Sequence, residues 1–192
     1  MIWDIPSTQN KILYLTFDDG PTTAATHWIL SALDEYSAKA TFFCVGENVA
    51  KHPEIYAALT DKGHAVGNHT YNHLNGWKTE TADYINNVAK AGGLIQSRLF
   101  RPPYGKIKRS QARALKYKGF HIILWSVLTY DFDKGLNTDD AWENILKYTR
   151  PGSIIVFHDH LKAFDNLREL LPKTLEYFKL QGYVFKKIEP HP

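Results

Sequence analysis

The chain has 192 residues, of which 44% are hydrophobic and 14% aromatic, enough to build the core of one domain. Its formal net charge of +3 comes without a run of lysines or arginines, so the composition does not indicate nucleic-acid binding. The single cysteine, Cys44, excludes an internal disulfide, and no apolar run approaches the roughly 20 residues that a membrane span needs.

Cys44 lies in an apolar segment, and we interpret it as a small core residue rather than a nucleophile. The first six residues do not combine a basic region with an apolar stretch, so we expect no secretion signal in this chain. The sequence leaves the compartment and the oligomeric state open.

Strands and helices alternate along the chain. In order, we expect a strand at 12–15, a helix at 22–36, a strand at 39–45, a helix at 52–62, a strand at 64–67, a helix at 79–97, a strand at 99–101, a helix at 108–118, a strand at 121–127, a helix at 138–148, a strand at 153–157, a helix at 166–180 and a strand at 183–188. Thr22 or Thr23 is expected to cap the first helix, and Asn137 or Thr138 the helix at 138–148. This alternation predicts an α/β fold of about seven parallel strands, as a barrel or a doubly wound sheet. No Gly-x-Gly-x-x-Gly follows the first strand, so the nucleotide-binding version of the open sheet lacks support.

Unusual polar residues lie where these strands end. They are Asp18 and Asp19 after the first strand, His69 and His73 after the third, Arg101 at the end of the fourth, Asp131 and Asp133 after the fifth, and His158 and Asp159 at the end of the sixth. In a parallel α/β barrel, active sites are built on the face formed by the carboxyl ends of the strands. The sequence therefore predicts one shared site, although the residues at 18–21 also suit a simple turn or helix cap.

A metal site is indicated by three of these residues. His69 and His73 are four residues apart, which places both imidazoles on one side of a helical turn. With the carboxylate of Asp19 they offer a divalent metal three ligands and leave a position for water. This donor set suits zinc, with cobalt, nickel or manganese as substitutes. Taken alone, the two histidines are weak evidence for a site, and ordinary surface or core histidines are the more frequent explanation.

The remaining residues suggest an acid and a base. Asp18 can accept a proton from the water that the metal activates, and Arg101 can keep Asp18 ionised and oriented. His158 can protonate a leaving group from the opposite side, and a backbone N–H near Tyr104 can stabilise an oxyanion. A structural ion pair for Arg101 and a structural role for His158 are the alternatives.

Together these motifs resemble the polysaccharide deacetylase family, also called the NodB homology domain or carbohydrate esterase family 4. The resemblance covers most of the chain, in Thr-Phe-Asp-Asp-Gly-Pro at 16–21, His-Thr-Tyr-Asn-His at 69–73, Arg-Pro-Pro-Tyr-Gly at 101–105 and the segment 154–158. It implies a distorted (β/α) barrel, a divalent metal and hydrolysis of N-acetyl groups on sugars. It also implies roles: Asp18 as base, Asp19, His69 and His73 as metal ligands, Arg101 as the residue that orients the base, Tyr104 as an oxyanion donor through its amide, and His158 as acid.

The fourth motif of the family departs from its usual Asp-x-x-Asp-Trp and reads Leu-Thr-Tyr-Asp-Phe at 128–132. In the family the first aspartate tunes the acid histidine, and Leu128 cannot do so. The tryptophan that walls the acetyl pocket becomes Phe132. We interpret Asp131 as a loop or cap residue rather than a catalytic one. In the fifth motif, Ile154 and Val156 replace leucines.

The sequence thus predicts a single-domain, metal-dependent hydrolase that removes N-acetyl groups from N-acetylglucosamine-containing glycans. Peptidoglycan, chitin-type oligosaccharides and lipid-linked amino sugars all remain candidate substrates. The side chains expected to contact substrate are Tyr71, Pro103, Tyr104, Trp125, Phe132 and Val156. The alternatives are a metal-containing glycan-binding protein without turnover, which Leu128 suggests, and an O-acetyl esterase or another linear-amide hydrolase. The family usually works outside the cytoplasm, but nothing in this chain directs its export.

Overall fold

The computed structural model describes residues 1–6 and 10–189. A curled sheet of parallel strands forms its centre, in the order β5-β4-β3-β2-β1-β7-β6, and a short strand β8 pairs with the start of β1. The strands are β1 (Ile12–Asp18), β2 (Ala40–Cys44), β3 (Ala65–Asn68), β4 (Leu99–Phe100), β5 (His121–Ile122), β6 (Val127–Leu128), β7 (Ile154–His158) and β8 (Val184–Phe185). The expected distorted (β/α) barrel is confirmed, as a half-barrel with β5 and β6 at its two ends.

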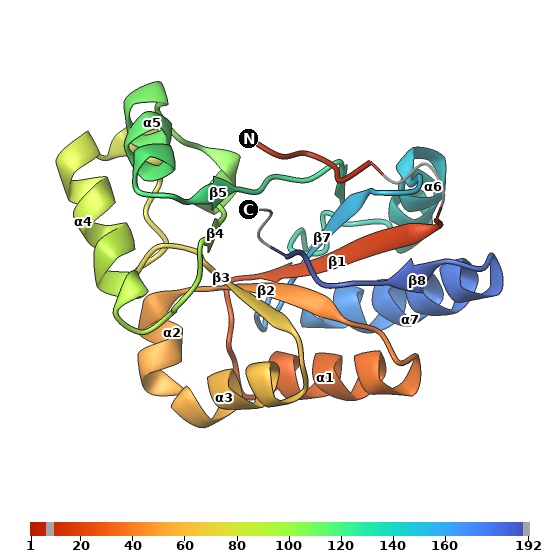
Figure 1. The fold of residues 1–192 in the computed structure, drawn as a ribbon. Coiled ribbons are helices and arrows are strands. Elements are labelled where there is room, and N and C mark those ends of the chain that lie inside the picture. Colours follow the sequence, from red (N-terminus) through yellow and green to blue (C-terminus); the bar gives the residue numbers. More distant parts are fainter. Residues whose placement is uncertain (7–9, 190–192) are drawn as a thin grey trace.

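Helices surround the outer side of this half-barrel (Figure 1). They are α1 (Ala25–Glu35), α2 (Gly46–Lys51), α3 (Pro53–Asp61), α4 (Thr81–Gly92), α5 (Arg109–Tyr117), α6 (Thr138–Tyr148) and α7 (Phe164–Leu180), with single 3-10 turns η1 (Gly76–Lys78) and η2 (Pro103–Gly105). Their apolar sides supply the core: α1 buries Ile29 and Leu33, and α7 buries Leu171 and Leu175. Burial of each such side chain is worth about 1.5–3 kcal/mol, which fixes the helices against the sheet.

The central strand β1 carries the first site residues to the edge of the barrel. Of its seven residues, all but Tyr14 are buried, because neighbouring strands and helices enclose it. Phe17 stacks against Phe42 of β2 and Phe157 of β7, with ring centroids 5.0 and 5.8 Å away. This register pairs Asp18 with His158 across β1 and β7. The packing of the phenylalanines therefore sets two candidate catalytic side chains next to each other.

The predicted strand at 121–127 is wrong as a single element. Its two ends belong to β5 and β6, which lie at opposite ends of the sheet. The segment between them crosses the open side of the half-barrel. There Ile2 forms a parallel bridge with Ile123, donating its N–H to the carbonyl of Ile122 and accepting from the N–H of Leu124. A continuous apolar run does not distinguish a strand from such a buried crossing segment.

Several other boundaries also differ from those expected. Neither Thr22 nor Thr23 caps α1, whose N-cap residue Ala24 makes no side-chain hydrogen bond. Of the two residues proposed as the cap of α6, Asn137 fills that role. Helix α2 was not expected, the predicted helix at 79–97 ends at Gly92, and the predicted strand at 183–188 is reduced to β8.

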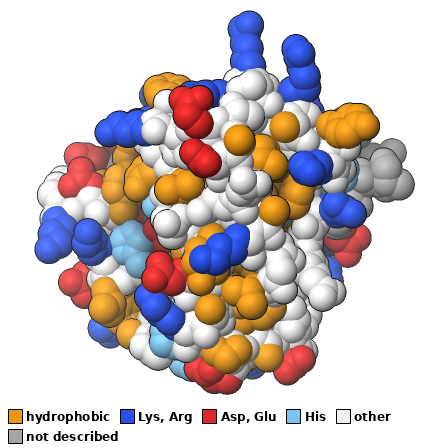
Figure 2. Space-filling view, turned by 90° about the vertical axis from the view of Figure 1, so that its left-hand side faces the viewer, with side chains coloured by type: hydrophobic (Ala, Val, Ile, Leu, Met, Phe, Trp, Pro, Cys, Tyr) orange, Lys and Arg blue, Asp and Glu red, His pale blue; other side chains and the backbone are white. Residues whose placement is uncertain are grey.

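The surface agrees with the mild net charge. On the face over α4 and α5, lysines and arginines are interspersed with carboxylates, and apolar side chains occur in small groups between them (Figure 2). Cys44 is buried in β2, as a core residue should be. Among the described residues, none of the helices combines the length and the apolar character that a membrane span requires.

Candidate metal centre and active site

The segments that carry the candidate site have unusual backbone geometry. Asp19, Thr70, His73 and Tyr104 all have positive φ, at 87°, 65°, 57° and 61°. For residues other than glycine such conformations cost about 1–3 kcal/mol and persist only where the surroundings hold them. Asp19 is held on both sides, because its N–H donates to the carbonyl of Phe43 and its carbonyl accepts from the Asn48 side chain. Conformations of this kind are typical of functional sites.

A buried carboxylate fixes the turn that follows Asp19. Asp159 accepts a hydrogen bond from the N–H of Gly20 at 2.6 Å and another from the hydroxyl of Thr26 at 2.9 Å. A Cβ atom on Gly20 would lie 1.8 Å from Asp159 Oδ2, so only glycine fits at this position. Burial raises the pKa of Asp159 well above its usual value. The end of β7 is thereby tied to the aspartate pair at the end of β1.

Asp19, His69 and His73 lie together at the centre of the site. One ligand atom from each lies within 4.8 Å of the other two. Oδ1 of Asp19 is 3.6 Å from Nε2 of His69 and 3.1 Å from Nε2 of His73. The expectation that the histidines share a helical turn is wrong, because 69–73 is an irregular segment after β3 with positive φ at Thr70 and His73. Their rings nevertheless converge, with centroids 5.1 Å apart.

The other nitrogen of each imidazole has its own partner. Nδ1 of His69 lies 2.8 Å from the backbone carbonyl of Arg101, which accepts only, so Nδ1 carries the proton. Nδ1 of His73 lies 3.1 Å from the hydroxyl of Tyr104. Such contacts orient metal-binding histidines and leave Nε2 free as the ligand atom.

The electrostatics of this cluster suit a bound cation. Burial alone would raise the pKa of Asp19, but contacts with His73, His69 and His158 outweigh it and hold that pKa below its usual range. Burial lowers the pKa of His69 to about 4, so this imidazole is neutral and its Nε2 lone pair is available. Among the described residues, the buried Oδ1 of Asp19 has no hydrogen-bond partner. The neutral imidazole of His69, the imidazole of His73 and an unpartnered carboxylate oxygen are a donor set that fits a divalent transition metal.

Asp18 stands beside this cluster and is paired with Arg101. Nη1 of Arg101 donates to Oδ1 of Asp18 at 2.7 Å and to the hydroxyl of Thr16 at 2.8 Å. Nη2 donates to the carbonyl of Leu124, and the guanidinium lies 4.1 Å from the ring centroid of Phe43. Arg101 is fully buried, so its charge is compensated mainly by Asp18. The pair fixes the orientation of the Asp18 carboxylate.

Asp131 lies in a turn after β6, as expected of a loop residue, but its side chain also contacts the candidate acid. Its Oδ1 lies 2.7 Å from Nδ1 of His158, and its Oδ2 accepts the backbone N–H of His158 at 2.8 Å. Burial by itself lowers the pKa of His158, but the hydrogen bond and charge of Asp131, with smaller contributions from Asp18 and Asp19, raise it to about 9. Asp131 therefore raises the pKa of His158, the role that the first aspartate of the family's fourth motif has and that Leu128 cannot fill.

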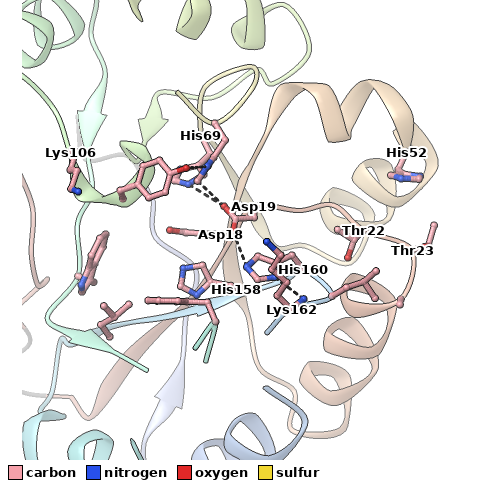
Figure 3. A pocket seen from close by; sticks show the side chains of 17 residues that line it. Asp18, Asp19, Thr22, Thr23, His52, His69, Lys106, His158, His160 and Lys162 are labelled. Carbon is pink, nitrogen blue, oxygen red and sulfur yellow. Dashed lines mark hydrogen bonds and ion pairs between the residues drawn. The ribbon is translucent and has the colours of Figure 1, made fainter. Parts of the chain in front are cut away.

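The two aspartates at the end of β1, the two histidines after β3 and His158 line a cleft of about 960 Å³. Figure 3 shows Asp18, Asp19, His69 and His158 at its centre, with Lys106 to one side and His52, Thr22 and Thr23 to the other. Its walls contain three of the residues expected to contact substrate, Tyr104, Trp125 and Phe132, together with Leu128. The ring of Phe132 meets that of His158 edge-on at 5.0 Å.

The other three residues expected to contact substrate are not part of the cleft wall. Tyr71 faces α4, where its ring lies 3.6 Å below Nζ of Lys90. Val156 is buried within the sheet between β1 and β6, and Pro103 is buried at the start of η2. Asp133 is exposed and accepts the N–H of Gly135, so it does not join the site either.

Sequence reasoning missed His160, which lines the cleft. Its Nε2 lies 3.4 Å from Oδ2 of Asp19. The signal that was available is its position two residues after His158, at the end of a strand whose tip already carries the candidate acid.

Known proteins are similar to this chain in sequence and in fold. Residues 6–123 match the family described as Polysaccharide deacetylase. A peptidoglycan-N-acetylglucosamine deacetylase of Bacillus cereus is 38% identical over 170 residues, which are 83% of this chain and 62% of that protein. A second protein of that name from the same species is 31% identical over 189 residues, 95% of this chain and 88% of the other.

A solved structure has the same fold. The crystal structure of the Bc1960 peptidoglycan N-acetylglucosamine deacetylase superposes with a TM-score of 0.90 at 34% identity, over 97% of this chain and 90% of that one. A family match over more than half of the chain, joined to this structural likeness, leads to one conclusion. This chain belongs to the polysaccharide deacetylase family.

Proposed function

We propose that this protein is a metal-dependent hydrolase that removes acetyl groups from N-acetylglucosamine residues of a glycan, with peptidoglycan as the first candidate. The observation that carries the proposal is that one cleft contains a carboxylate paired with a buried arginine, three metal-ligating groups and a histidine whose pKa is raised. The names of the relatives support the substrate class.

Asp19, His69 and His73 would hold the metal, and zinc fits their donor set best. When bound, such a cation lowers the pKa of a coordinated water toward about 7 and polarises a nearby carbonyl. We assign the remaining work to residues of the chain itself.

Asp18 is the proposed base. It accepts a proton from the water that attacks the acetamide carbonyl, while Arg101 holds Oδ1 of Asp18 in place through a hydrogen bond. His158 is the proposed acid: with a pKa of about 9 it is protonated at neutral pH and can donate to the departing amine. The reaction needs an ionised carboxylate as its base and a charged histidine as its acid at the same pH.

The cleft wall gives the acetyl group and the sugar their surroundings. The backbone N–H of Tyr104, in the strained turn η2, is the proposed donor to the developing oxyanion. Trp125 and Phe132 provide apolar walls. Because the cleft extends to both sides of the metal ligands, we infer that it accepts a sugar within an oligosaccharide rather than a monosaccharide alone.

The test measures acetate and free amine together from chitooligosaccharides and peptidoglycan fragments, with zinc added. Asp18→Asn should keep the metal and lower kcat by about 10²-fold or more, because the base is gone. His69→Ala should lose the metal, measured as bound zinc per chain. Asp133→Asn, which changes an exposed carboxylate outside the cleft, is the matched control and should behave like the wild type.

Near wild-type turnover by Asp18→Asn would remove the proposed mechanism. Acetate release from O-acetylated xylan without amine release from any N-acetylated substrate would instead identify an esterase. Leu128 was the reason to consider a glycan-binding protein without turnover. Because Asp131 contacts His158 instead, that reason no longer applies.

A further inference from the structure

His160 contacts the side of Asp19 that faces away from the metal ligands. Oδ1 of Asp19 faces Nε2 of His69 and His73, whereas Oδ2 lies 3.4 Å from Nε2 of His160. Figure 3 shows Asp19 between the two groups, with contacts running in opposite directions. The two oxygens of one carboxylate are thus divided between two sets of imidazoles.

The local backbone determines which nitrogen of His160 carries the proton. Nδ1 accepts hydrogen bonds from the N–H groups of Lys162 at 3.1 Å and Ala163 at 3.2 Å. A nitrogen that accepts has no proton, so the neutral ring carries its proton on Nε2. Nε2 of His160 is therefore an N–H donor and has no lone pair for a metal. The ring is also immobilised, because the two donors precede α7 and Ala163 is fully buried.

We propose that His160 is a positioning residue, which directs its Nε2–H to Oδ2 of Asp19 and so keeps Oδ1 turned toward the metal. Asp19 would then offer Oδ1 to the metal in the orientation that the structure shows. This inference rests on the proposed function only in taking Asp19 as a metal ligand. Loss of such a contact behind a ligand typically weakens metal binding by about 10–100-fold.

Two substitutions of His160 distinguish the role of its Nδ1 from that of its Nε2. His160→Asn keeps an acceptor close to the place of Nδ1, for Lys162 and Ala163, but removes the donor to Asp19. His160→Gln places an N–H donor near the position of Nε2 and removes the acceptor. The metal-free proteins are titrated with zinc against a competing chelator. We expect His160→Asn to bind zinc about 10–100-fold more weakly than the wild type, and His160→Gln to stay within a few-fold of it.

Cobalt provides a second readout that does not depend on turnover. If His160 stands behind Asp19, the visible absorption bands of the cobalt-loaded protein keep their positions in both variants, since the three ligands are unchanged. Thermal unfolding with excess chelator checks that each variant is folded before metal is added.

Zinc affinity of His160→Asn equal to that of the wild type would overturn the proposal, as would equal losses in both variants, which would show that the turn matters and not the donor. A shift of the cobalt bands in His160→Asn would make His160 a ligand instead. None of these results depends on acetate release, so they remain separate from failure of the proposed function.

Discussion

At the scale of single residues, Asp131 holds His158 by both its ring and its backbone. One carboxylate oxygen lies 2.7 Å from Nδ1 and the other accepts the backbone N–H at 2.8 Å. The first contact stabilises the charged imidazole, and the second fixes the end of β7 relative to that carboxylate. Charge and orientation of the proposed acid therefore depend on the same side chain.

This arrangement predicts the alkaline limit of activity. His158 has its pKa raised to about 9, so its charged form persists through neutral pH and is lost as the pH rises through 9. Asp131→Asn removes the negative charge, and burial then pulls the pKa of His158 down. We expect the alkaline limb of the kcat/KM profile to move from near 9 to lower pH, with activity at pH 8 reduced by about 10-fold.

The control for this profile is Asp133→Asn, two residues away and exposed. It should leave the alkaline limb in place. An unchanged limb in Asp131→Asn would mean that another group sets the alkaline limit.

The three candidate metal ligands were readable from sequence, whereas their partners were not. Two patterns, adjacent aspartates and His-x-x-x-His, are rare and chemically specific, and they identify Asp19, His69 and His73. Asp131 resembles a loop residue in the sequence because the motif, matched by position, has Leu128 where an aspartate is expected. Which of two nearby loop positions reaches His158 depends on the loop between β6 and α6, and residue spacing does not encode that path.

At the scale of elements, α6 is fixed at its start by Asn137. The side chain accepts from the N–H groups of Asp139 at 3.0 Å and Asp140 at 3.4 Å, which have no partner inside the helix. Thr138, the other candidate cap, instead donates its hydroxyl to Glu169 of α7. The cap and this tether together hold α6 against α7.

Removal of the cap should weaken the protein by a defined amount. Asn137→Ala leaves the first N–H groups of α6 without their acceptor, and we expect a loss of about 1 kcal/mol in the free energy of unfolding. Urea unfolding monitored by circular dichroism measures it. Asn137→Ser keeps a capping oxygen and should lose only a few tenths of that; equal stability of the alanine variant and the wild type would contradict the role of the cap.

The alternation of strands and helices was predictable because it follows from periodicity, but two features of the elements were not. Whether a threonine caps α1 depends on the turn at 20–24, which Asp159 ties to β7 through a contact 139 residues away in sequence. The break between β5 and β6 depends on Ile2 reaching across the open side of the half-barrel. Both are tertiary effects that a local window does not contain.

At the scale of the whole molecule, His64 makes stability depend on pH. It is 4% exposed, its Nδ1 accepts the N–H of Ala40 at 3.1 Å, and its ring meets Phe42 edge-on. Burial, helped by the charges of Lys39 and Lys62, lowers the pKa of His64 to about 4. A histidine with a depressed pKa is protonated in the unfolded chain first, so the fold loses stability as the pH falls below 6.5 toward 4.

His64→Asn isolates this effect, since its side-chain oxygen can still accept from Ala40 but does not titrate. We expect the loss of unfolding free energy between pH 7 and pH 5 to be about 2 kcal/mol smaller in the variant than in the wild type. Equal losses would assign the acid sensitivity to other groups. The comparison of two slopes removes the constant cost of the smaller side chain.

The half-barrel itself was the most predictable level, because it needs only the order of elements and one apolar face on each. Its handedness and parallel pairing follow from general rules. Its incompleteness does not, since β5 and β6 are two residues each and are separated by a crossing segment of the same apolar character.

The concentration of left-handed backbone around the cleft has a consequence for anyone who selects this protein for heat tolerance. Of the six non-glycine residues with positive φ among those described, Ser37 alone lies apart; the others are Asp19, Thr70, His73, Tyr104 and Tyr130. Glycine or asparagine at the last four would relax the chain, so a screen for survival at high temperature enriches replacements there. Every such gain at His73 or Tyr104 removes an imidazole or its hydroxyl partner. Durable catalysts are therefore better sought by changes in the outer helices than around the cleft.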